Sequence, residues 1–429
     1  MNWEPAYALL LFSGTIITFL GALCIQKYRN RKKLFLSLVV ILNIGMLFFF
    51  KYYEFAASII ENCLKIIHLH ISLPHFTILL PVGISFYVLQ SLSYTIDVYR
   101  KSITPVHNFF RYSLFVSFFP QLVAGPIERT GHLLPQFEKF HTIEAQRIKS
   151  GAYLMLWGYF LKLVLADRCA IYVDSVYDNL YHHNGGSILL AILLFPFQIY
   201  GDFAGYSLIA IGCAKIMGFN LITNFKRPFF SSSISDFWRR WHISLSLWLK
   251  DYVYIPLGGS RKGEKKTYRN LILTFLVSGI WHGADWTFVV WGLLNGLIVS
   301  IERLFGIVKK KSSGVSALLR WGLFFIIICI LRIFIRASSL KDVGFMLKSI
   351  FVNFGKAQIQ MSELVTCLLA ITILMLKEIS EEFNFKLKQP AVLKSTHSVV
   401  FKICGVVAFL CFIILFGVFD GDQFIYFQF

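Results

Sequence analysis

The sequence predicts an all-α fold, a polytopic bundle of transmembrane helices. Hydrophobic residues make up 56% of the 429 residues, and the mean hydropathy is +0.64, whereas soluble domains contain about 45–50% apolar residues. Apolar runs recur from one end of the chain to the other, and basic residues gather in short stretches between them. We therefore expect one large membrane domain rather than the several soluble domains that this length would otherwise suggest.

The apolar runs are long enough to cross a bilayer, which takes about 20 residues of helix. The predicted spans are Tyr7–Ile25, Leu34–Phe50, Leu79–Val98, Phe109–Val123, Gly151–Ala166, Ile188–Ile211, Leu271–Trp291, Leu318–Ile335, Leu364–Leu376 and Val399–Val418. Two further runs, Phe55–Ile71 and Thr287–Ile301, are ambiguous, so we expect about ten to twelve spans. Within the single domain, 1–429, we distinguish N-terminal spans (1–80), a motif-bearing region expected to hold a catalytic site (81–305) and C-terminal spans (306–429).

The net charge of +19 is concentrated in short loops. The basic stretches are Lys27–Lys33, Lys226–Arg240, Arg261–Arg269 and Lys309–Lys311. Basic loops between apolar runs are typical of cytoplasmic loops that face anionic lipid, so we expect a partner in the bilayer and no nucleic acid. Positive charge after the first apolar run favours an N-terminus on the outer side. The eight cysteines form no CxxC pair, and the histidines lack carboxylates at metal-ligand spacing, so no metal site is predicted.

The segment Asp236–Tyr254, DFWRRWHISLSLWLKDYVY, predicts an amphipathic helix that Ser233 or Ser235 could cap. One helical stripe is apolar: Trp238, Trp241, Leu245 and Trp248. The stripe beside it is polar: Arg239, His242, Ser246 and Lys250. Two interpretations stay open. The helix is either an interfacial anchor held by tryptophans, or a binding element on which His242 meets an anionic or hydroxyl ligand.

A basic loop follows this segment. Its sequence, IPLGGSRKGEKK at 255–266, ends the helix at Pro256 and the glycines after it, and it includes Arg261. The loop is either a binding surface for a phosphate-bearing donor such as a coenzyme or an ordinary cytoplasmic loop. It is not a P-loop, because the GxxxxGK[ST] pattern is absent.

His282 is the most prominent candidate for chemistry. It lies in LTFLVSGIWHGADWTFVVWGLLNG, residues 273–296, where an ionisable side chain at membrane depth is costly and indicates function. Asp285 at i+3 on a helix could orient the imidazole, and Trp281 is one of the tryptophans around it. A histidine can take a proton from a hydroxyl and return it to a leaving group. The alternative is a buried structural histidine bonded to a backbone carbonyl.

Two polar motifs interrupt the membrane-embedded runs. PVGISFYVLQSLSYTIDVYR, residues 81–100, carries polar groups within a span, and FFPQLVAGPIERTGHLLPQF, residues 118–137, is broken by Pro120 and Pro126. Such features are tolerated where they line a cavity or pack inside protein. They predict either an aqueous funnel with re-entrant helices that reaches His282 or ordinary polar packing.

These blocks resemble the membrane-bound O-acyltransferase family, in particular its branch of membrane subunits that O-acetylate alginate, peptidoglycan and other cell-surface polysaccharides. The resemblance extends from residue 81 to residue 429 and also includes QIYGDFAGYSLIAIGCAKIMGFN, NFKRPFFSSSISDFWRRWHISLSLWLKDYVYIPLGGSRKG, SGIWHGADWTFVVWG, FIRASSL and the terminal FIYFQF. The histidine of the family's WHG motif corresponds to His282, and that of its RRWHIS motif corresponds to His242. The sequence departs from the family pattern at Gly201, Leu208 and Lys250, which leaves the donor and the partner open.

The resemblance implies a ring of helices around a central funnel. It also implies that acetyl or another short acyl group enters from the cytoplasm as a thioester, with acetyl-CoA as the donor and no bound cofactor. The group would leave on the outer side of a bacterial cytoplasmic membrane, towards an extracytoplasmic O-acetyltransferase partner protein or a polysaccharide acceptor. The alternatives are D-alanyl transfer to teichoic acid and a non-enzymatic transporter, although the chain lacks the repeated halves common in transporters.

Within this hypothesis each candidate residue has a role. His282 is the general base for the acceptor hydroxyl, and His242 orients the donor or the attacking group. Asp285 and Trp281 support them. The expected donor-binding residues at the cytoplasmic mouth are Arg239, Arg240, Lys250 and Arg261.

Overall fold

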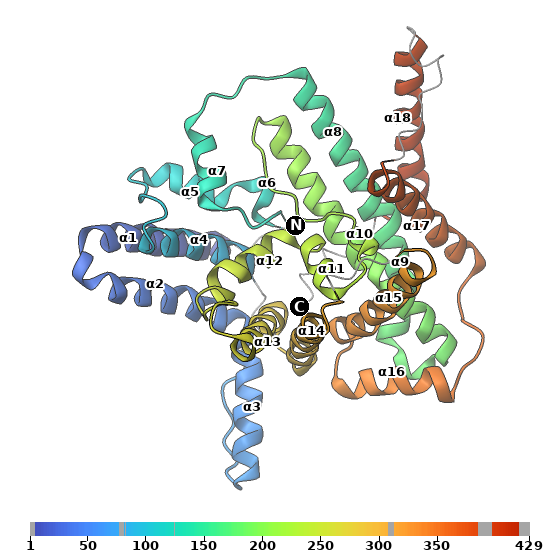
Figure 1. Ribbon diagram of the computed structural model, residues 1–429, viewed down its shortest axis with the longest axis horizontal. Coiled ribbons are helices and arrows are strands. Elements are labelled where there is room, and N and C mark those ends of the chain that lie inside the picture. The colour runs from blue at the N-terminus through green and yellow to red at the C-terminus, as the bar shows by residue number, and fades with distance from the viewer. Residues whose placement is uncertain are drawn as a thin grey trace.

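We analysed a computed structural model of the protein, which describes residues 5–76, 81, 83–123, 125–307, 313–384 and 397–419. The described residues form helices and no β-strand, as the sequence predicts (Figure 1). The α-helices are α1 (Pro5–Lys27), α2 (Lys32–Leu47), α3 (Tyr53–Ile66), α4 (Ile84–Tyr99), α5 (Phe109–Ser117), α6 (Phe119–Leu122), α7 (Thr130–Leu133), α8 (Ala145–Tyr159), α9 (Asp167–Asp178), α10 (Gly185–Ile216), α11 (Ile234–Arg240), α12 (Ile243–Leu249), α13 (Glu264–His282), α14 (Trp286–Leu304), α15 (Val315–Arg336), α16 (Leu340–Val352), α17 (Met361–Glu382) and α18 (His397–Phe416). The terminal FIYFQF motif lies outside the described residues.

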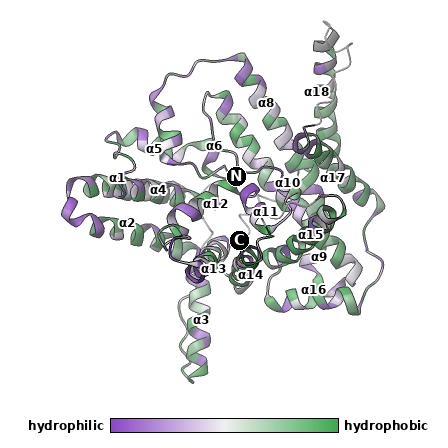
Figure 2. Ribbon diagram, in the orientation of Figure 1, coloured by the Kyte–Doolittle hydropathy of each residue, from purple (hydrophilic) through white to green (hydrophobic). Residues whose placement is uncertain are grey.

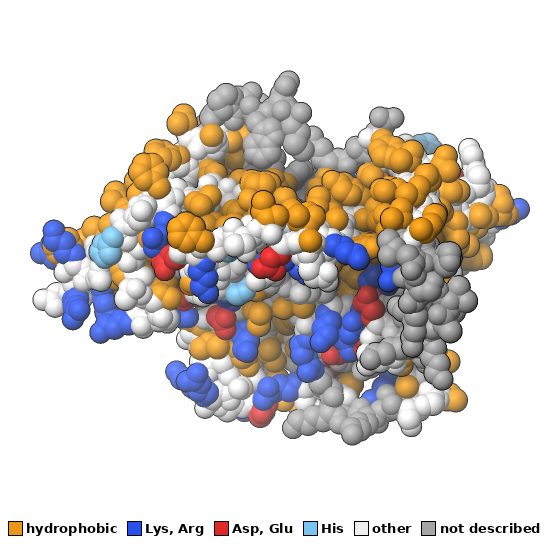
Figure 3. Space-filling model, turned by 90° about the horizontal axis from the view of Figure 1, so that it is seen from above, with side chains coloured by type: hydrophobic (Ala, Val, Ile, Leu, Met, Phe, Trp, Pro, Cys, Tyr) orange, Lys and Arg blue, Asp and Glu red, His pale blue; other side chains and the backbone are white. Residues whose placement is uncertain are grey.

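The exterior of the bundle is strongly apolar. Hydrophobic residues run along most helices, and hydrophilic residues gather at helix ends and connections (Figure 2). A broad band of hydrophobic side chains crosses the face in Figure 3, and lysine and arginine side chains gather next to it. Because large apolar side chains such as Leu9, Leu318 and Leu415 are exposed, this surface suits a hydrocarbon solvent.

Five helical stretches among the described residues are long and apolar enough to cross a membrane. They are Tyr7–Lys27, Arg29–Ile66, Gly185–Ile216, Trp286–Leu304 and Val315–Arg336. Some of the other predicted spans are shortened or divided in the structure, and one of them, Leu79–Val98, lies partly outside the described residues. The predicted span Phe109–Val123, for example, divides into α5 and the short α6, with Phe118 in an extended conformation between them. The chain is a multi-pass membrane protein.

The predicted single span Leu271–Trp291 is wrong. Helix α13 ends at His282, the backbone of Gly283 is extended, and Asp285 begins α14 by accepting a hydrogen bond from the Thr287 N–H at 2.8 Å. The two helices form a hairpin near the centre of the molecule (Figure 1). They approach so closely that a Cβ at Gly279 would lie 2.4 Å from the Phe288 carbonyl oxygen. The turn therefore places His282 at the tip of a hairpin and not in the middle of a span.

The helical stretch Arg29–Ile66 is continuous, but its middle is π-helical and not α-helical. Helix α2 passes through a π-helical segment, Phe48–Tyr52, directly into α3. Its 38 residues exceed the roughly 20 that cross a bilayer, and α3 projects from the rest of the bundle (Figure 1). The ambiguous run Phe55–Ile71 is thus helical as far as Ile66.

Helix α10 is the central buried element. It packs against α8 through glycines, since a Cβ at Gly158 would lie 2.7 Å from the Gly205 carbonyl oxygen. Beside this contact Lys162 forms buried ion pairs with Asp167 at 2.8 Å and Asp202 at 2.7 Å. Charged side chains are seldom buried unless they are paired in this way. The arrangement fixes α10 as the wall against which the candidate site is built.

Candidate active site

His282 is buried at the end of α13, with only 4% of its surface exposed. Its Nδ1 lies 2.7 Å from the carbonyl oxygen of Ser278, one helical turn earlier. Because a carbonyl oxygen can only accept a hydrogen bond, Nδ1 carries the proton of the neutral imidazole and Nε2 carries the lone pair. The buried histidine bonded to a backbone carbonyl, which the sequence left as an alternative, therefore has the tautomer that a general base requires.

His242 lies at a break in the predicted amphipathic helix. The continuous helix over Asp236–Tyr254 is wrong: α11 ends at Arg240, and His242 has left-handed backbone angles, φ 42° and ψ 53°, before α12 begins. Such angles are uncommon for a residue with a Cβ and often mark functional positions. As predicted, Ser233 caps the start, since its side chain accepts a hydrogen bond from the Asp236 N–H at 3.1 Å.

Asn224 maintains this turn from outside the helices. Its backbone carbonyl accepts the Ile243 N–H at 2.9 Å, and its side-chain oxygen accepts the Ser244 hydroxyl at 2.7 Å. The same side-chain oxygen lies 3.3 Å from Nδ1 of His242. The break turns His242 into the protein, where it is fully buried, while Arg239 and Lys250 stay exposed. The predicted polar stripe, which placed His242 on one helix face with Arg239 and Lys250, is therefore wrong.

The indole of Trp281 packs close to the imidazoles of both histidines. Its ring centroid is 4.9 Å from that of His282 and 6.1 Å from that of His242. Phe86 from α4 packs edge-on against Trp281, and Phe203 from α10 packs edge-on against His242. Residues from four separate motifs thus meet in one buried aromatic cluster.

A cavity of about 400 Å³ lies among residues of α11, α12 and α13. Arg239 and Lys250 line it together with apolar residues of α11, α12 and α13, and Ser278 belongs to its lining. Ser278 is fully buried, and among the described residues its hydroxyl has no hydrogen-bond partner. The cavity therefore connects two exposed cationic side chains to the helical turn that holds His282.

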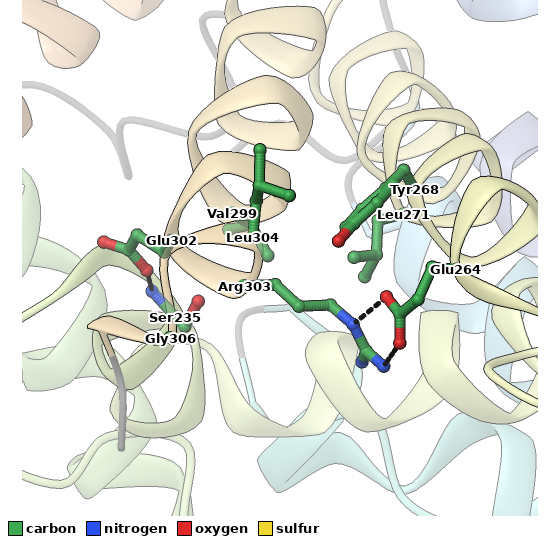
Figure 4. Close-up of a pocket in the computed structure, with 9 residues that line it drawn as sticks. All are labelled: Ser235, Glu264, Tyr268, Leu271, Val299, Glu302, Arg303, Leu304 and Gly306. Carbon is green, nitrogen blue, oxygen red and sulfur yellow. Dashed lines mark hydrogen bonds and ion pairs between the residues drawn. The ribbon is translucent and has the colours of Figure 1, made fainter. Parts of the chain in front are cut away.

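A second hollow, of about 630 Å³, lies between the start of α13 and the end of α14 (Figure 4). Its cation, Arg303, is paired with Glu264 at 3.1 Å. Glu302 accepts the Ser235 N–H at 2.7 Å and thereby caps α11. These charged groups already have structural partners, so we place the candidate site in the first cavity.

The remaining predicted residues lie apart from the histidines or serve the scaffold. Asp285 is the N-cap of α14, so the expected helical i+3 spacing to His282 does not exist. Arg240 forms ion pairs with Asp236 at 3.2 Å and Glu382 at 2.9 Å. Arg261 is exposed on the turn that follows the π-helical segment Lys250–Tyr254.

Sequence reasoning missed several residues of the site. Lys51 and Tyr52 bind the end of α13 from the N-terminal spans, Asn224 maintains the break at His242, and Ser278 lines the cavity. Only Lys51 carried a signal, since it is a charged residue within an apolar run. The others depend on contacts between distant segments.

The fold and the site define a multi-pass helical membrane protein with two histidines buried around one tryptophan. Residues 32–339 match the profile of the MBOAT, membrane-bound O-acyltransferase family, and the chain belongs to this family. It is 42% identical over 326 residues to a probable alginate O-acetylase, AlgI, of Pseudomonas syringae pv. tomato, covering 76% of this chain and 61% of the relative. It is 36% identical to a peptidoglycan O-acetyltransferase of Helicobacter pylori, covering 81% and 70%. It is 30% identical to a teichoic acid D-alanyltransferase of Bacillus subtilis, covering 50% and 56%.

Proposed function

We propose that the protein is an O-acyltransferase that moves an acetyl or short acyl group from a cytoplasmic thioester donor, acetyl-CoA, across the membrane for O-acetylation of a cell-surface polysaccharide. One observation carries the proposal: a cavity leads from Arg239 and Lys250 to Ser278, whose carbonyl oxygen holds the imidazole of His282. The names of the relatives that act on alginate and peptidoglycan support the acetyl group and the polysaccharide.

The cavity has the character of a site for an acyl thioester. Its volume falls within the range of about 300–1,000 Å³ that is usual for ligand pockets, and most of its lining is apolar. Arg239 and Lys250 supply positive charge for the phosphates of the donor, while the apolar lining accepts the acyl-bearing arm. Arg261, on the following turn, extends the positive charge, whereas Arg240 is held in its ion pairs.

The chemistry follows from the tautomer of His282. Nε2 takes the proton of the acceptor hydroxyl while the hydroxyl oxygen attacks the thioester carbonyl carbon. The carbon–sulfur bond then breaks, and the departing thiolate receives the proton from His282. General base catalysis of this kind contributes roughly 10²–10⁴ in rate. Holding both substrates in one narrow site adds a further positioning effect.

Ser278, Trp281 and His242 complete the proposed site. The hydroxyl of Ser278 is buried in the cavity lining and available to donate a hydrogen bond to the thioester carbonyl oxygen, where negative charge develops. Trp281 packs against both imidazoles and orients them. His242 orients the donor or the attacking group.

The acceptor hydroxyl approaches from the outer side of a bacterial cytoplasmic membrane, so the new ester leaves on that side. An extracytoplasmic O-acetyltransferase partner protein or the polysaccharide itself receives the acyl group. In the proposed orientation Lys27 and the basic residues after it face the cytoplasm, in agreement with the positive-inside rule.

The proposal is tested by measuring ester-linked acetate on cell-surface polymers. Cells that lack the gene are complemented with the wild type, His282→Ala, His242→Ala or, as a matched control, the exposed His107→Ala. Protein levels in the membrane are measured for each. We expect the ester to disappear in the His282→Ala cells at a normal protein level and to persist with His107→Ala. The polymer that loses its ester identifies the acceptor. Unchanged acetylation with His282→Ala contradicts the proposal.

A second measurement separates the acetyl donor from an aminoacyl donor. Membranes that contain the protein are given either labelled acetyl-CoA or a labelled D-alanyl carrier protein. Incorporation from acetyl-CoA alone supports the proposal, and incorporation from the carrier alone indicates D-alanyl transfer, as in the name of the Bacillus subtilis relative.

A further inference from the structure

The last turn of α13 is bound by two side chains from the N-terminal spans. The Lys51 ammonium donates hydrogen bonds to the carbonyl oxygens of Trp281 and His282, both at 2.9 Å. The Tyr52 hydroxyl donates to the carbonyl oxygen of Ile280 at 2.9 Å. Three consecutive carbonyls at the end of the histidine-bearing helix are therefore held by residues about 230 positions earlier in the chain.

These carbonyls need partners because a helix cannot satisfy its own last four. Little water is available at membrane depth to replace them. A neutral donor such as the Tyr52 hydroxyl would be sufficient to satisfy these carbonyls. A lysine among apolar residues costs more free energy to bury, so its presence beside the candidate base indicates a functional use. A cation at a helix C-terminus also interacts favourably with the helix dipole.

The local backbone directs both side chains to the site. Lys51 and Tyr52 belong to the π-helical segment Phe48–Tyr52, in which the extra residue per turn changes the direction of the side chains that follow. Phe48 and Phe49, in the same segment, are 45% and 44% exposed on the apolar surface. Isolated π-helical turns are frequent at functional sites.

We propose that Lys51 is a positioning residue for the acyl transfer reaction. Its ammonium holds the backbone carbonyls of Trp281 and His282, and thereby the orientation of the indole and the imidazole. Tyr52 holds the neighbouring carbonyl in the same way. The inference rests on the proposed function, because it assigns Lys51 to the reaction that His282 performs, and it makes the N-terminal spans part of the active site.

The test compares Lys51→Met, Lys51→Arg and Tyr52→Phe with Lys33→Met, an exposed lysine in the same helical stretch. For each variant, kcat and KM for acetyl-CoA are measured in membranes, together with protein level and thermal stability in detergent. We expect Lys51→Met to lower kcat by roughly 10–100-fold, since small misplacements of reacting groups have effects of this size. KM should change by less than about twofold because the donor cavity is unchanged. Lys51→Arg should restore most of kcat, and Lys33→Met should match the wild type.

Two outcomes overturn the inference: a wild-type kcat in Lys51→Met, or a raised KM with an unchanged kcat, which would make Lys51 a donor-binding residue. If Lys51→Met does not accumulate in the membrane, Tyr52→Phe tests the inference in its place. We expect Tyr52→Phe to lower kcat several-fold, and an unchanged kcat would contradict the inference. His282→Ala is included in the same assay. Activity retained in His282→Ala overturns the proposed function itself, whereas its loss beside a fully active Lys51→Met overturns only the role of Lys51.

Discussion

The carbonyl oxygen of Ser278 lies 2.7 Å from Nδ1 of His282, and both residues occupy the same face of α13, one turn apart. The backbone of one residue therefore fixes the tautomer of the other. The side chain of Ser278 lines the cavity, and the imidazole of His282 lies one helical turn further along α13. The proposed transfer of an acyl group from a thioester to an alcohol uses Nε2 of His282 as the proton acceptor and the Ser278 hydroxyl as a hydrogen-bond donor.

Replacing His282 by glutamine should abolish transfer without unfolding the protein. Glutamine keeps a polar side chain at the buried position but cannot take up a proton, so we expect kcat to fall by roughly 10²–10⁴. The measurement is the initial rate of acetyl transfer from labelled acetyl-CoA, with protein level and thermal stability determined in parallel. A His282→Gln protein with more than a tenth of the wild-type rate would remove the general base from the mechanism.

Replacing Ser278 by alanine should lower the activity of the protein without lowering its stability. Because its hydroxyl has no hydrogen-bond partner among the described residues, removing the hydroxyl should leave the melting temperature unchanged or higher. Loss of a hydrogen bond to the developing oxyanion should nevertheless lower kcat by roughly 10²–10³-fold.

Ser300→Ala is the matched control for this variant. The hydroxyl of Ser300 is also buried in a helix, but it donates to the Gly296 carbonyl oxygen at 2.7 Å. We expect Ser300→Ala to keep its kcat. Equal rates in the two variants would contradict a role for the Ser278 hydroxyl.

The sequence was sufficient for the helical class and the family, because hydropathy and short motifs are local properties of a sequence. The roles of His282 and His242 stay predictions. The sequence was not sufficient for the turn after His282. Residues 271–291 are apolar on both sides of the short segment His282–Asp285, so hydropathy averaged over a span does not distinguish a hairpin from one span. The break at His242 depends on Asn224, and the end of α13 depends on Lys51; such long-range contacts leave no periodicity in the sequence.

The mouth of the cavity should contribute to donor affinity and little to the chemical step. Arg239→Gln combined with Lys250→Gln removes both cations that line the cavity, so we expect KM for acetyl-CoA to rise by roughly tenfold while kcat changes little. Raising the salt concentration should weaken donor binding to the wild type more than to the double variant, because exposed charges are screened.

The control for the double variant is Lys341→Gln combined with Lys348→Gln, two exposed lysines of α16 that do not line the cavity. This pair loses the same formal charge and should keep the wild-type KM and salt dependence. A similar rise of KM in both double variants would indicate a general effect of charge and not a donor site.

The closeness of α13 and α14 should make Gly279 intolerant of any side chain. An added Cβ would lie 2.4 Å from the Phe288 carbonyl oxygen and 3.0 Å from Cα of Gly292, so Gly279→Ala has to push the hairpin apart. Overpacking of this kind costs about 1–3 kcal/mol. We expect a lower melting temperature in detergent and a loss of activity, since the displacement moves the helix that carries His282. Gly322→Ala in α15, where no atom lies within 4 Å of the added Cβ, should be neutral or stabilising. A Gly279→Ala protein as stable as Gly322→Ala would show that the hairpin is more open than the packing of its glycines indicates.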